Sequence, residues 1–434
     1  MAEKKKGINS KRKIILLGIS VILLIAISIV YSLIGYKFFM RGAFIAETNK
    51  NIAERGHLIS ETHVTTLTKD QVNDFLPEQN KLEGNISDVP KYDIDLYKIV
   101  YTSDYNGKVV NLSGMIMIPK RADKITQLQY HHGSLYPYPA ESGWGSEDAP
   151  SLYDGKAPHA PKSNYETRMY GNMLASNGYL VSMPDYAGYG IASNLEHPYS
   201  VNPELAKESV DMILATREFA KKHSIDLNEK VGLYGWSEGG AVSTATQKLI
   251  ESKYNDKIKV LANAEMSGPL RVADTFKYAL IFMPLLSEEM NTESLDYLAW
   301  VYYAYNKFSN HPVANELIFD IPVKNDLDVL NKRKTNITKE VFKNLDKETY
   351  QHMLNQALKS DLVVGWKPKA PIFVHHGDND ELVPYDNNAE VAVNTYNKNG
   401  GKATLVKYPG HTHISLGALY IKNIIDEFNS LESK

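Results

Sequence analysis

The residues best placed to do chemistry lie in the stretch LYGWSEGGAV at positions 233–242, where Ser237 stands between Gly235 and Gly239. A serine in this Gly-x-Ser-x-Gly spacing can act as a nucleophile when it sits on a sharp turn from a strand to a helix. The residues before it are apolar and strand-like, and EGGAVSTATQKLIESKY after it has the composition of a helix. The flanking glycines permit a strained turn and a close backbone approach. The sequence therefore predicts that Ser237 is a nucleophile.

A serine hydroxyl is a weak nucleophile and needs a base, normally a histidine that a carboxylate holds in place. Two later loops supply these groups. The first, HHGDNDELVPY, contains Asp378 and Asp380, and the second contains His411 and His413 just before the last helical run. Serine, acid and histidine in this chain order are expected of a site at the carboxyl edge of an α/β sheet. The residues alone leave two candidates for the acid and two for the base.

The elements that must position these groups alternate between strand-like and helical runs from about residue 95 onward. Such alternation is typical of a mostly parallel sheet with helices on both faces. Asn106-Gly107 favours a tight turn, so the first two strands are expected to form an antiparallel hairpin at one edge. The predicted strands are 97–104, 109–119, 126–133, 178–186, 230–236, 259–268, 371–378 and 403–410, and the predicted helices are 164–176, 203–223, 238–253, 386–398 and 414–432.

One long interval interrupts the alternation, between Gly268 and Pro371. It is rich in aromatic residues, as in LDYLAWVYYAYNKF, and then in charged helix-forming segments. We predict a helical cap inserted over the sheet at about 269–368. An aromatic stripe of this kind more often packs in a core than lines a substrate site, and a cap would allow both.

The N-terminal region predicts an exported protein. Six Lys and Arg residues within 1–13 precede the uncharged run 14–35, which as a helix would span roughly 33 Å and cross a bilayer. The charge asymmetry predicts a cytoplasmic tail at 1–13, a transmembrane signal-anchor helix at 14–35 and the rest outside. A cleavable secretory signal is the alternative. Residues 36–60 are interpreted as a helical stalk, and 61–434 as one domain with its cap.

The composition excludes several other classes. With 43% hydrophobic and 23% charged residues and a net charge of -3, the chain has no strongly basic surface, so we expect no nucleic-acid partner. The absence of cysteine excludes disulfides and thiolate sites.

The sequence lacks both a His-Glu-x-x-His motif and a complete calcium-binding loop. The histidine pairs 131–132 and 375–376 lie at strand ends and are interpreted as structural or site-lining. We therefore expect no metal and no cofactor.

A family resemblance rests on blocks in matching order: QYHHGS, PDYAGYG, GWSEGG and the two late loops GDNDELVP and YPGHTH. From about residue 95 to 434 the chain resembles an α/β-hydrolase, and it is similar to the secretory lipase and esterase group. In that group the motif Gly-x-x-Asp-x-x-Val-Pro carries the acid, which implies Asp380, with Asp378 as the fallback. The motif Gly-x-x-His implies His413 as the base, with His411 as the competitor.

The resemblance also implies an oxyanion hole, which is the pair of donors that binds the negative oxygen formed during acyl transfer. One donor would be the backbone N–H of Glu238, the residue after the nucleophile. The second would be the backbone N–H of Ser134, with Gly133 next in line. Loss of one such donor typically costs on the order of 100- to 1000-fold in rate.

The reaction implied is hydrolysis of a small-molecule or lipid ester in two acyl-transfer steps through an acyl-enzyme on Ser237. Asp380 would orient the imidazole of His413. Two alternatives stay open: a serine peptidase of related fold, and a non-catalytic, membrane-tethered binding protein on a hydrolase scaffold. The complete serine, acid and histidine set favours catalysis, although a fold alone does not guarantee chemistry. The short segment before the first strand has no room for the propeller of a prolyl-oligopeptidase-like enzyme.

Overall fold

The strands of the computed structural model form one nine-stranded sheet in the order β1-β2-β3-β5-β4-β6-β7-β8-β9. The structure describes residues 54–77, 86–140, 143–276, 292–319, 321–331 and 348–432. The strands are β1 (Leu58–Leu67), β2 (Ile94–Tyr105), β3 (Lys108–Pro119), β4 (Ile125–His131), β5 (Leu180–Pro184), β6 (Leu227–Trp236), β7 (Lys259–Met266), β8 (Ile372–Gly377) and β9 (Ala403–Tyr408).

The predicted, mostly parallel sheet is confirmed. Strands β5, β4, β6, β7, β8 and β9 pair in parallel, whereas β1, β2 and β3 form an antiparallel edge that joins β5. The predicted hairpin is β2 and β3. Its turn lies at Asn106 and Gly107, whose φ angles of 50° and 80° are the positive values that a tight two-residue hairpin turn needs.

Helices cover both faces of the sheet, as predicted. On one face α5, α6 and α12 pack on β6 and β8 through residues such as Val210, Ala245 and Val374. On the other face α4 and α13 pack on β3, β4 and β5 through residues such as Leu174 and Ile421. The main helices are α2 (Lys69–Asp74), α4 (Met173–Asn177), α5 (Asn202–Lys222), α6 (Glu238–Leu249), α12 (Ala389–Lys398) and α13 (Gly417–Glu432), with π-helical turns η4 (Thr167–Asn172) and η6 (Ile250–Tyr254) and short 3-10 turns η2 (Ser146–Asp148), η3 (Pro150–Leu152), η5 (Gly190–Ala192) and η7 (Asn315–Leu317).

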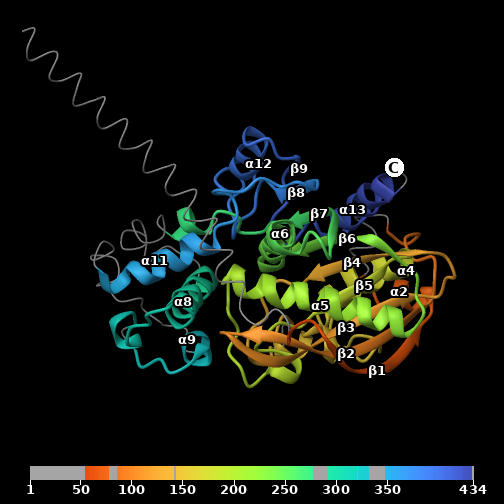
Figure 1. Ribbon diagram of the computed structural model, residues 1–434, viewed down its shortest axis with the longest axis horizontal. Coiled ribbons are helices and arrows are strands. Elements are labelled where there is room, and N and C mark those ends of the chain that lie inside the picture. Colours follow the sequence, from red (N-terminus) through yellow and green to blue (C-terminus); the bar gives the residue numbers. More distant parts are fainter. Residues whose placement is uncertain are drawn as a thin grey trace, which may run out of the picture.

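In the long interval between β7 and β8, the described residues form the helices α8 (Thr292–Lys307), α9 (Asp326–Asn331) and α11 (Glu348–Ser360). They lie together beside the sheet, at the left of Figure 1. The aromatic stripe of α8 is mostly core: Trp300, Tyr302 and Tyr305 are fully buried in one apolar cluster. This cluster also contains Tyr199 from the loop before α5, so the inserted helices pack on the sheet domain through aromatic rings.

Strand β1 was missed by the sequence analysis. The predicted stalk reached residue 60, but β1 begins at Leu58 and pairs with β2, and Arg55 is already buried. This edge strand is only partly buried, so its sequence LISETHVTTL carries little of the alternation that marks a strand. The predicted tail, transmembrane helix and the first part of the stalk, residues 1–53, lie outside the described residues. Within those that are described, no helix has both the length and the apolar character that crossing a membrane requires.

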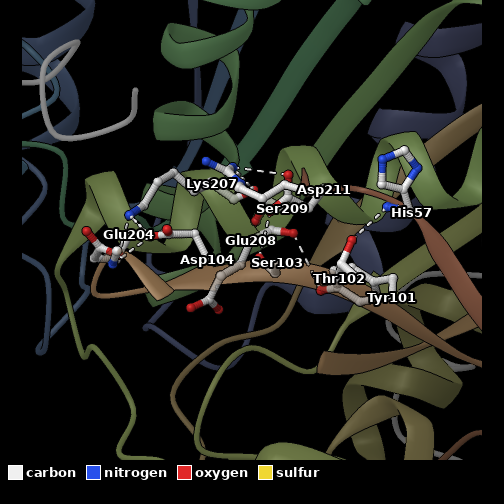
Figure 2. A network of polar contacts seen from close by, with 12 residues as sticks. His57, Tyr101, Thr102, Ser103, Asp104, Glu204, Lys207, Glu208, Ser209 and Asp211 are labelled. Carbon is white, nitrogen blue, oxygen red and sulfur yellow. Dashed lines mark hydrogen bonds and ion pairs between the residues drawn. The ribbon is translucent and has the colours of Figure 1, made fainter. Parts of the chain in front are cut away.

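Buried charges fasten α5 to the antiparallel edge of the sheet (Figure 2). Lys207 Nζ lies 2.5 Å from Asp104 Oδ1, and Arg55 donates to both carboxylate oxygens of Asp211 at 2.9 and 3.0 Å. Removing one partner of such a buried pair typically costs about 3–5 kcal/mol. The network therefore fixes the position of α5 and, with it, of the loop that precedes α5.

Candidate active site

Ser237 occupies the strained turn that the sequence predicts. β6 ends at Trp236, α6 begins at Glu238, and Ser237 between them has φ 57° and ψ -123°, which is unusual for a residue with a side chain. Its backbone N–H donates to Met266 O at 2.8 Å, which ties the turn to the end of β7. The side chain is partly exposed.

The glycines beside Ser237 are required by close packing of the backbone. A Cβ atom added to Gly239 would lie 1.9 Å from His131 O, and one added to Gly235 would lie 2.4 Å from Gly239 O. Real Cβ contacts are never this short, and backbone atoms cannot move aside easily. The spacing of the motif therefore follows from the approach of α6 to the strand ends.

The structure brings Asp380 and His413 together from two different loops. His413 Nδ1 donates to Asp380 Oδ2 at 2.8 Å, while Asp380 Oδ1 accepts the backbone N–H groups of Leu382 and Val383 at 3.0 and 2.8 Å. Burial alone would raise the pKa of Asp380, but the hydrogen bonds from His376 and His413 outweigh burial and hold the pKa well below its usual range. Asp380 is therefore an ionised carboxylate that can orient the His413 ring.

A second histidine, His376, also contacts Asp380. His376 Nε2 donates to Val383 O at 2.7 Å and lies 3.3 Å from Asp380 Oδ2. Burial alone would lower the pKa of His376, but Asp380, and then Glu265, raise it. Burial also raises the pKa of Glu265 to about 8. The sequence predicts only a structural or site-lining role for His376, and the fold of the loop after β8 shows that it shares the carboxylate with His413.

Trp236 links the Ser237 turn to His413. The indole Nε1 donates to His413 O at 3.1 Å, and the two rings lie 5.5 Å apart between centroids. Trp236 immediately precedes Ser237, so the loop that carries His413 is held directly beside the turn that carries the serine. This contact joins the turn that carries Ser237 to the loop that carries His413, the partner of Asp380.

The competing residues Asp378 and His411 lie elsewhere in the same loops. Asp378 accepts the Gly410 N–H at 2.6 Å and lies 3.1 Å from Lys407 Nζ. His411 Nδ1 lies 3.2 Å from Ser415 Oγ, and its side chain is more exposed than that of His413. The described contacts thus pair Asp380 with His413, and they give Asp378 and His411 separate local partners.

The loop predicted to carry the second oxyanion donor adjoins the serine. A Cβ added to Gly133 would lie 3.5 Å from Ser237 Cβ. The Gly133 N–H donates to Glu166 Oε2 at 2.8 Å, so this amide is occupied. No described residue accepts a hydrogen bond from the backbone N–H of Ser134 or of Glu238. Neither amide is thus engaged by the part of the chain that the structure describes.

Glu166 is a buried acid that the sequence analysis did not single out. Its Oε2 accepts Tyr130 OH at 2.6 Å as well as the Gly133 N–H, and burial raises the pKa of Glu166 to about 7. It lies in the helical run after residue 162, far in sequence from both partners, and no local motif marks it. It fixes the loop that leads to Ser134.

The side chain of Glu238 is buried as well. Its Oε1 atom accepts the backbone N–H of Ser200 at 3.0 Å and lies 3.1 Å from His197 Nε2. The other ring nitrogen of His197 lies 2.9 Å from Ala187 O. Burial alone would lower the pKa of His197, but Glu238 raises it.

The strand-end histidines do not assemble a metal site. His131 Nδ1 lies 3.0 Å from Tyr234 O, and His132 Nε2 lies 3.1 Å from Asp185 O. Each of these two rings therefore has a backbone carbonyl as a hydrogen-bond partner. In the part of the chain that the structure describes, no group of three or more His, Cys, Asp or Glu side chains could hold a metal ion.

A sequence model of a known family matches the part of the chain that contains Ser237, Asp380 and His413. The sequence model of the secretory lipase family matches residues 162–421, more than half of the 434-residue chain, and this match covers the serine turn and both late loops. The chain belongs to the secretory lipase family. A secreted triacylglycerol lipase of Malassezia furfur is 22% identical over 55% of this chain and 48% of its own length. A second secreted triacylglycerol lipase of the same species is 24% identical over 53% of this chain and 59% of its own length. The match thus spans about half the length of these relatives.

Solved structures show the same fold over a larger part of the chain. The rice cell wall degrading esterase of Xanthomonas oryzae superposes with a TM-score of 0.62 over 87% of this chain and 96% of its own, at 20% sequence identity. With the sheet order described above, this likeness establishes an α/β-hydrolase fold for this chain.

Proposed function

We propose that this chain is a carboxylic ester hydrolase of the lipase and esterase type. Ser237 is the nucleophile, His413 the general base, Asp380 the acid that orients it, and the amides of Glu238 and Ser134 form the oxyanion hole. The observation that carries the proposal is the Asp380–His413 pair at 2.8 Å, in a loop that Trp236 holds beside the Ser237 turn. A serine, a histidine and a buried carboxylate in this arrangement are the machinery of acyl transfer.

The reaction proceeds in two steps. Ser237 Oγ attacks the ester carbonyl while His413 Nε2 takes its proton, and the amides of Glu238 and Ser134 stabilise the oxyanion. Collapse expels the alcohol with the proton from His413 and leaves an acyl-enzyme. Water then attacks, gives a proton to His413, and a second collapse returns that proton to Ser237 and releases the carboxylic acid. No cofactor takes part in either step.

The proposed substrate is an ester with an apolar acyl chain. Two observations support this class. The relatives in Malassezia furfur are named as triacylglycerol lipases, and the helices inserted between β7 and β8 present partly exposed aromatic side chains such as Tyr297 beside Tyr136 of the Ser134 loop. Initial rates with p-nitrophenyl esters of increasing chain length would place the enzyme among lipases or short-chain esterases.

A burst experiment tests the mechanism. With p-nitrophenyl acetate we expect a rapid release of p-nitrophenol close to one equivalent when deacylation is slower than acylation. The Ser237→Ala variant should show no burst and a turnover lower by on the order of a million-fold. Turnover near that of the wild type in this variant would contradict the proposal and would favour a binding protein. Activity on peptides but not on esters would favour the peptidase.

We also propose that the catalytic domain acts outside the cytoplasm. The basic segment and apolar run of residues 1–35 support export, and both relatives in Malassezia furfur are named as secreted. Anchoring by residues 14–35 and release after cleavage remain two forms of this proposal. Cell fractionation with an antibody against the catalytic domain would separate them, and recovery in the cytoplasm alone would contradict both.

A further inference from the structure

Both proposed oxyanion donors are held by one short segment, residues 196–200, which ends just before α5. Tyr199 OH lies 2.8 Å from Ser134 Oγ. On the other donor, Ser200 N–H and His197 Nε2 both contact Glu238 Oε1, at 3.0 and 3.1 Å. The side chains of Ser134 and Glu238 are therefore both held by residues 196–200. In our proposal, the amides of these two residues face the reacting centre.

The same segment is fastened to helix α8 of the inserted region. The ring of Tyr199 stacks on that of Trp300 with centroids 4.0 Å apart and planes 4° from parallel. Glu196 accepts Tyr303 OH at 2.7 Å and lies 2.5 Å from Lys307 Nζ. Tyr305 OH also donates to Ser200 O at 3.2 Å. Four side chains on one helix thus fix a segment of five residues.

The segment is built to hold a single conformation. Ser200 has φ 56°, in the left-handed region that a residue with a side chain adopts only when its surroundings enforce it. His197 is 1% exposed and Tyr199 is 7% exposed. His197 Nε2 lies 3.1 Å from Glu238 Oε1 and both side chains are buried, so this contact also restricts the position of Glu238.

We propose that residues 196–200 are a positioning element for the oxyanion hole, in which Tyr199 sets the Ser134 loop, His197 and Ser200 set Glu238, and helix α8 keeps the segment in place. This inference rests on the proposed function. None of these side chains touches the reacting atoms, so their loss should lower kcat and leave substrate binding nearly unchanged.

The first test removes one hydrogen bond. Tyr199→Phe deletes the hydroxyl that contacts Ser134 and keeps the ring on Trp300. We expect kcat to fall about 10- to 100-fold, because a displaced donor keeps part of its effect, while KM stays within about twofold. The matched control is Tyr302→Phe on α8, whose buried hydroxyl has no partner among the described residues and whose loss should leave kcat unchanged.

A double-mutant cycle shows whether Tyr199 acts through Ser134. Ser134→Ala removes the same hydrogen bond and keeps the backbone N–H. We expect Tyr199→Phe to have little further effect on kcat in the Ser134→Ala background. Full additivity of the two effects, or a Tyr199→Phe variant with wild-type kcat, would overturn the inference.

The second test concerns α8. Trp300→Leu removes the aromatic face on which Tyr199 stacks, whereas Trp300→Phe keeps one. We expect Trp300→Leu to lower kcat by at least as much as Tyr199→Phe, and Trp300→Phe to restore most of it. Rates are counted per active site by titration with a fluorophosphonate, so an unfolded fraction does not contribute. Equal kcat in the two Trp300 variants would overturn the role of α8.

Failure of this inference can be told apart from failure of the proposed function. If wild-type protein is labelled at Ser237 and hydrolyses esters, but Tyr199→Phe behaves as wild type, only the positioning role is wrong. If wild-type protein is neither labelled nor active, the proposed function is wrong and the positioning role falls with it.

Discussion

Asp380 and Glu166 are both buried carboxylates, and each contacts a loop that lies near Ser237. Their pKa values nevertheless shift in opposite directions. Asp380 accepts two backbone N–H groups and contacts two histidines, whereas Glu166 accepts one tyrosine hydroxyl and one amide. Burial raises the pKa of Glu166 to about 7, but the donors around Asp380 overcome burial and lower its pKa. Burial favours the protonated form of both acids, and the pKa is lowered only where enough hydrogen-bond donors surround the carboxylate, as at Asp380.

This difference suits the two sides of the proposed site. A negative Asp380 stabilises the positive charge that His413 acquires when it takes the serine proton. Near the oxyanion a fixed negative charge would oppose catalysis, and the raised pKa of Glu166 reduces the negative charge it carries near neutral pH. Two carboxylates of one site can thus take different roles because their surroundings push their pKa values apart.

The largest expected effect separates the two histidines of the last loop. His413→Ala should lower turnover by on the order of a million-fold, because the base that activates Ser237 is lost. His411→Ala should keep activity within about tenfold, because the His411 ring contacts Ser415 and Tyr408, both within four residues of it. Ester hydrolysis by both variants, side by side, is the measurement. An inactive His411→Ala beside an active His413→Ala would reverse the assignment of the base.

Variants of the two acids, Asp380 and Glu166, should differ in kcat by less than variants of the two histidines do, but the difference should still be large. Asp380→Asn should lower kcat by about 10,000-fold, since an amide at this position favours the wrong tautomer of the histidine. Glu166→Gln should keep kcat within about tenfold, because its carbonyl oxygen can still accept the Gly133 N–H. Steady-state kinetics of the two isosteric variants measure this contrast, and equal losses in both would break it.

The smallest expected effect is on stability against pH. The folded pKa of Glu166, about 7, lies above the ordinary value of a glutamate carboxyl, so this acid binds a proton more tightly in the folded state. Its contribution to stability is therefore fully present below about pH 4.5, decreases as pH rises through about 7, and is constant above that. Over this pH range, the melting temperature of the wild type should fall relative to that of Glu166→Gln as pH rises. Parallel curves would mean that Glu166 is ionised like Asp380.

The sequence predicted the parts of the fold that local patterns encode. The Asn106-Gly107 hairpin, the alternating strands and the turn at Ser237 depend on neighbouring residues, and the structure has each of them close to its predicted place. The predicted helix at 164–176 begins as the π-helical turn Thr167–Asn172, a distinction that residue types do not encode. Strand β1 was missed because an edge strand with little burial has little pattern.

The remaining features of the site depend on contacts between distant residues. Glu166 meets Gly133, and Tyr199 meets both Ser134 and Trp300, across separations that no spacing rule covers. The pairing of Asp380 with His413 was reached through a family resemblance, and the residues alone left two acids and two histidines open. Sequence patterns indicate which residues can carry out acyl transfer. The buried residues that position them, such as Glu166 and Tyr199, are brought near the site only by folding.

The most direct test of the central claim is labelling of the 434-residue chain, purified in detergent, by a fluorophosphonate, followed by mass spectrometry of the intact protein and of its peptides. We expect one equivalent of label on Ser237, and none in Ser237→Ala or in wild-type protein inhibited beforehand by an ester-like inhibitor. A folded wild-type chain that takes up no label, or a label that persists in Ser237→Ala, would contradict the claim that Ser237 is an activated nucleophile.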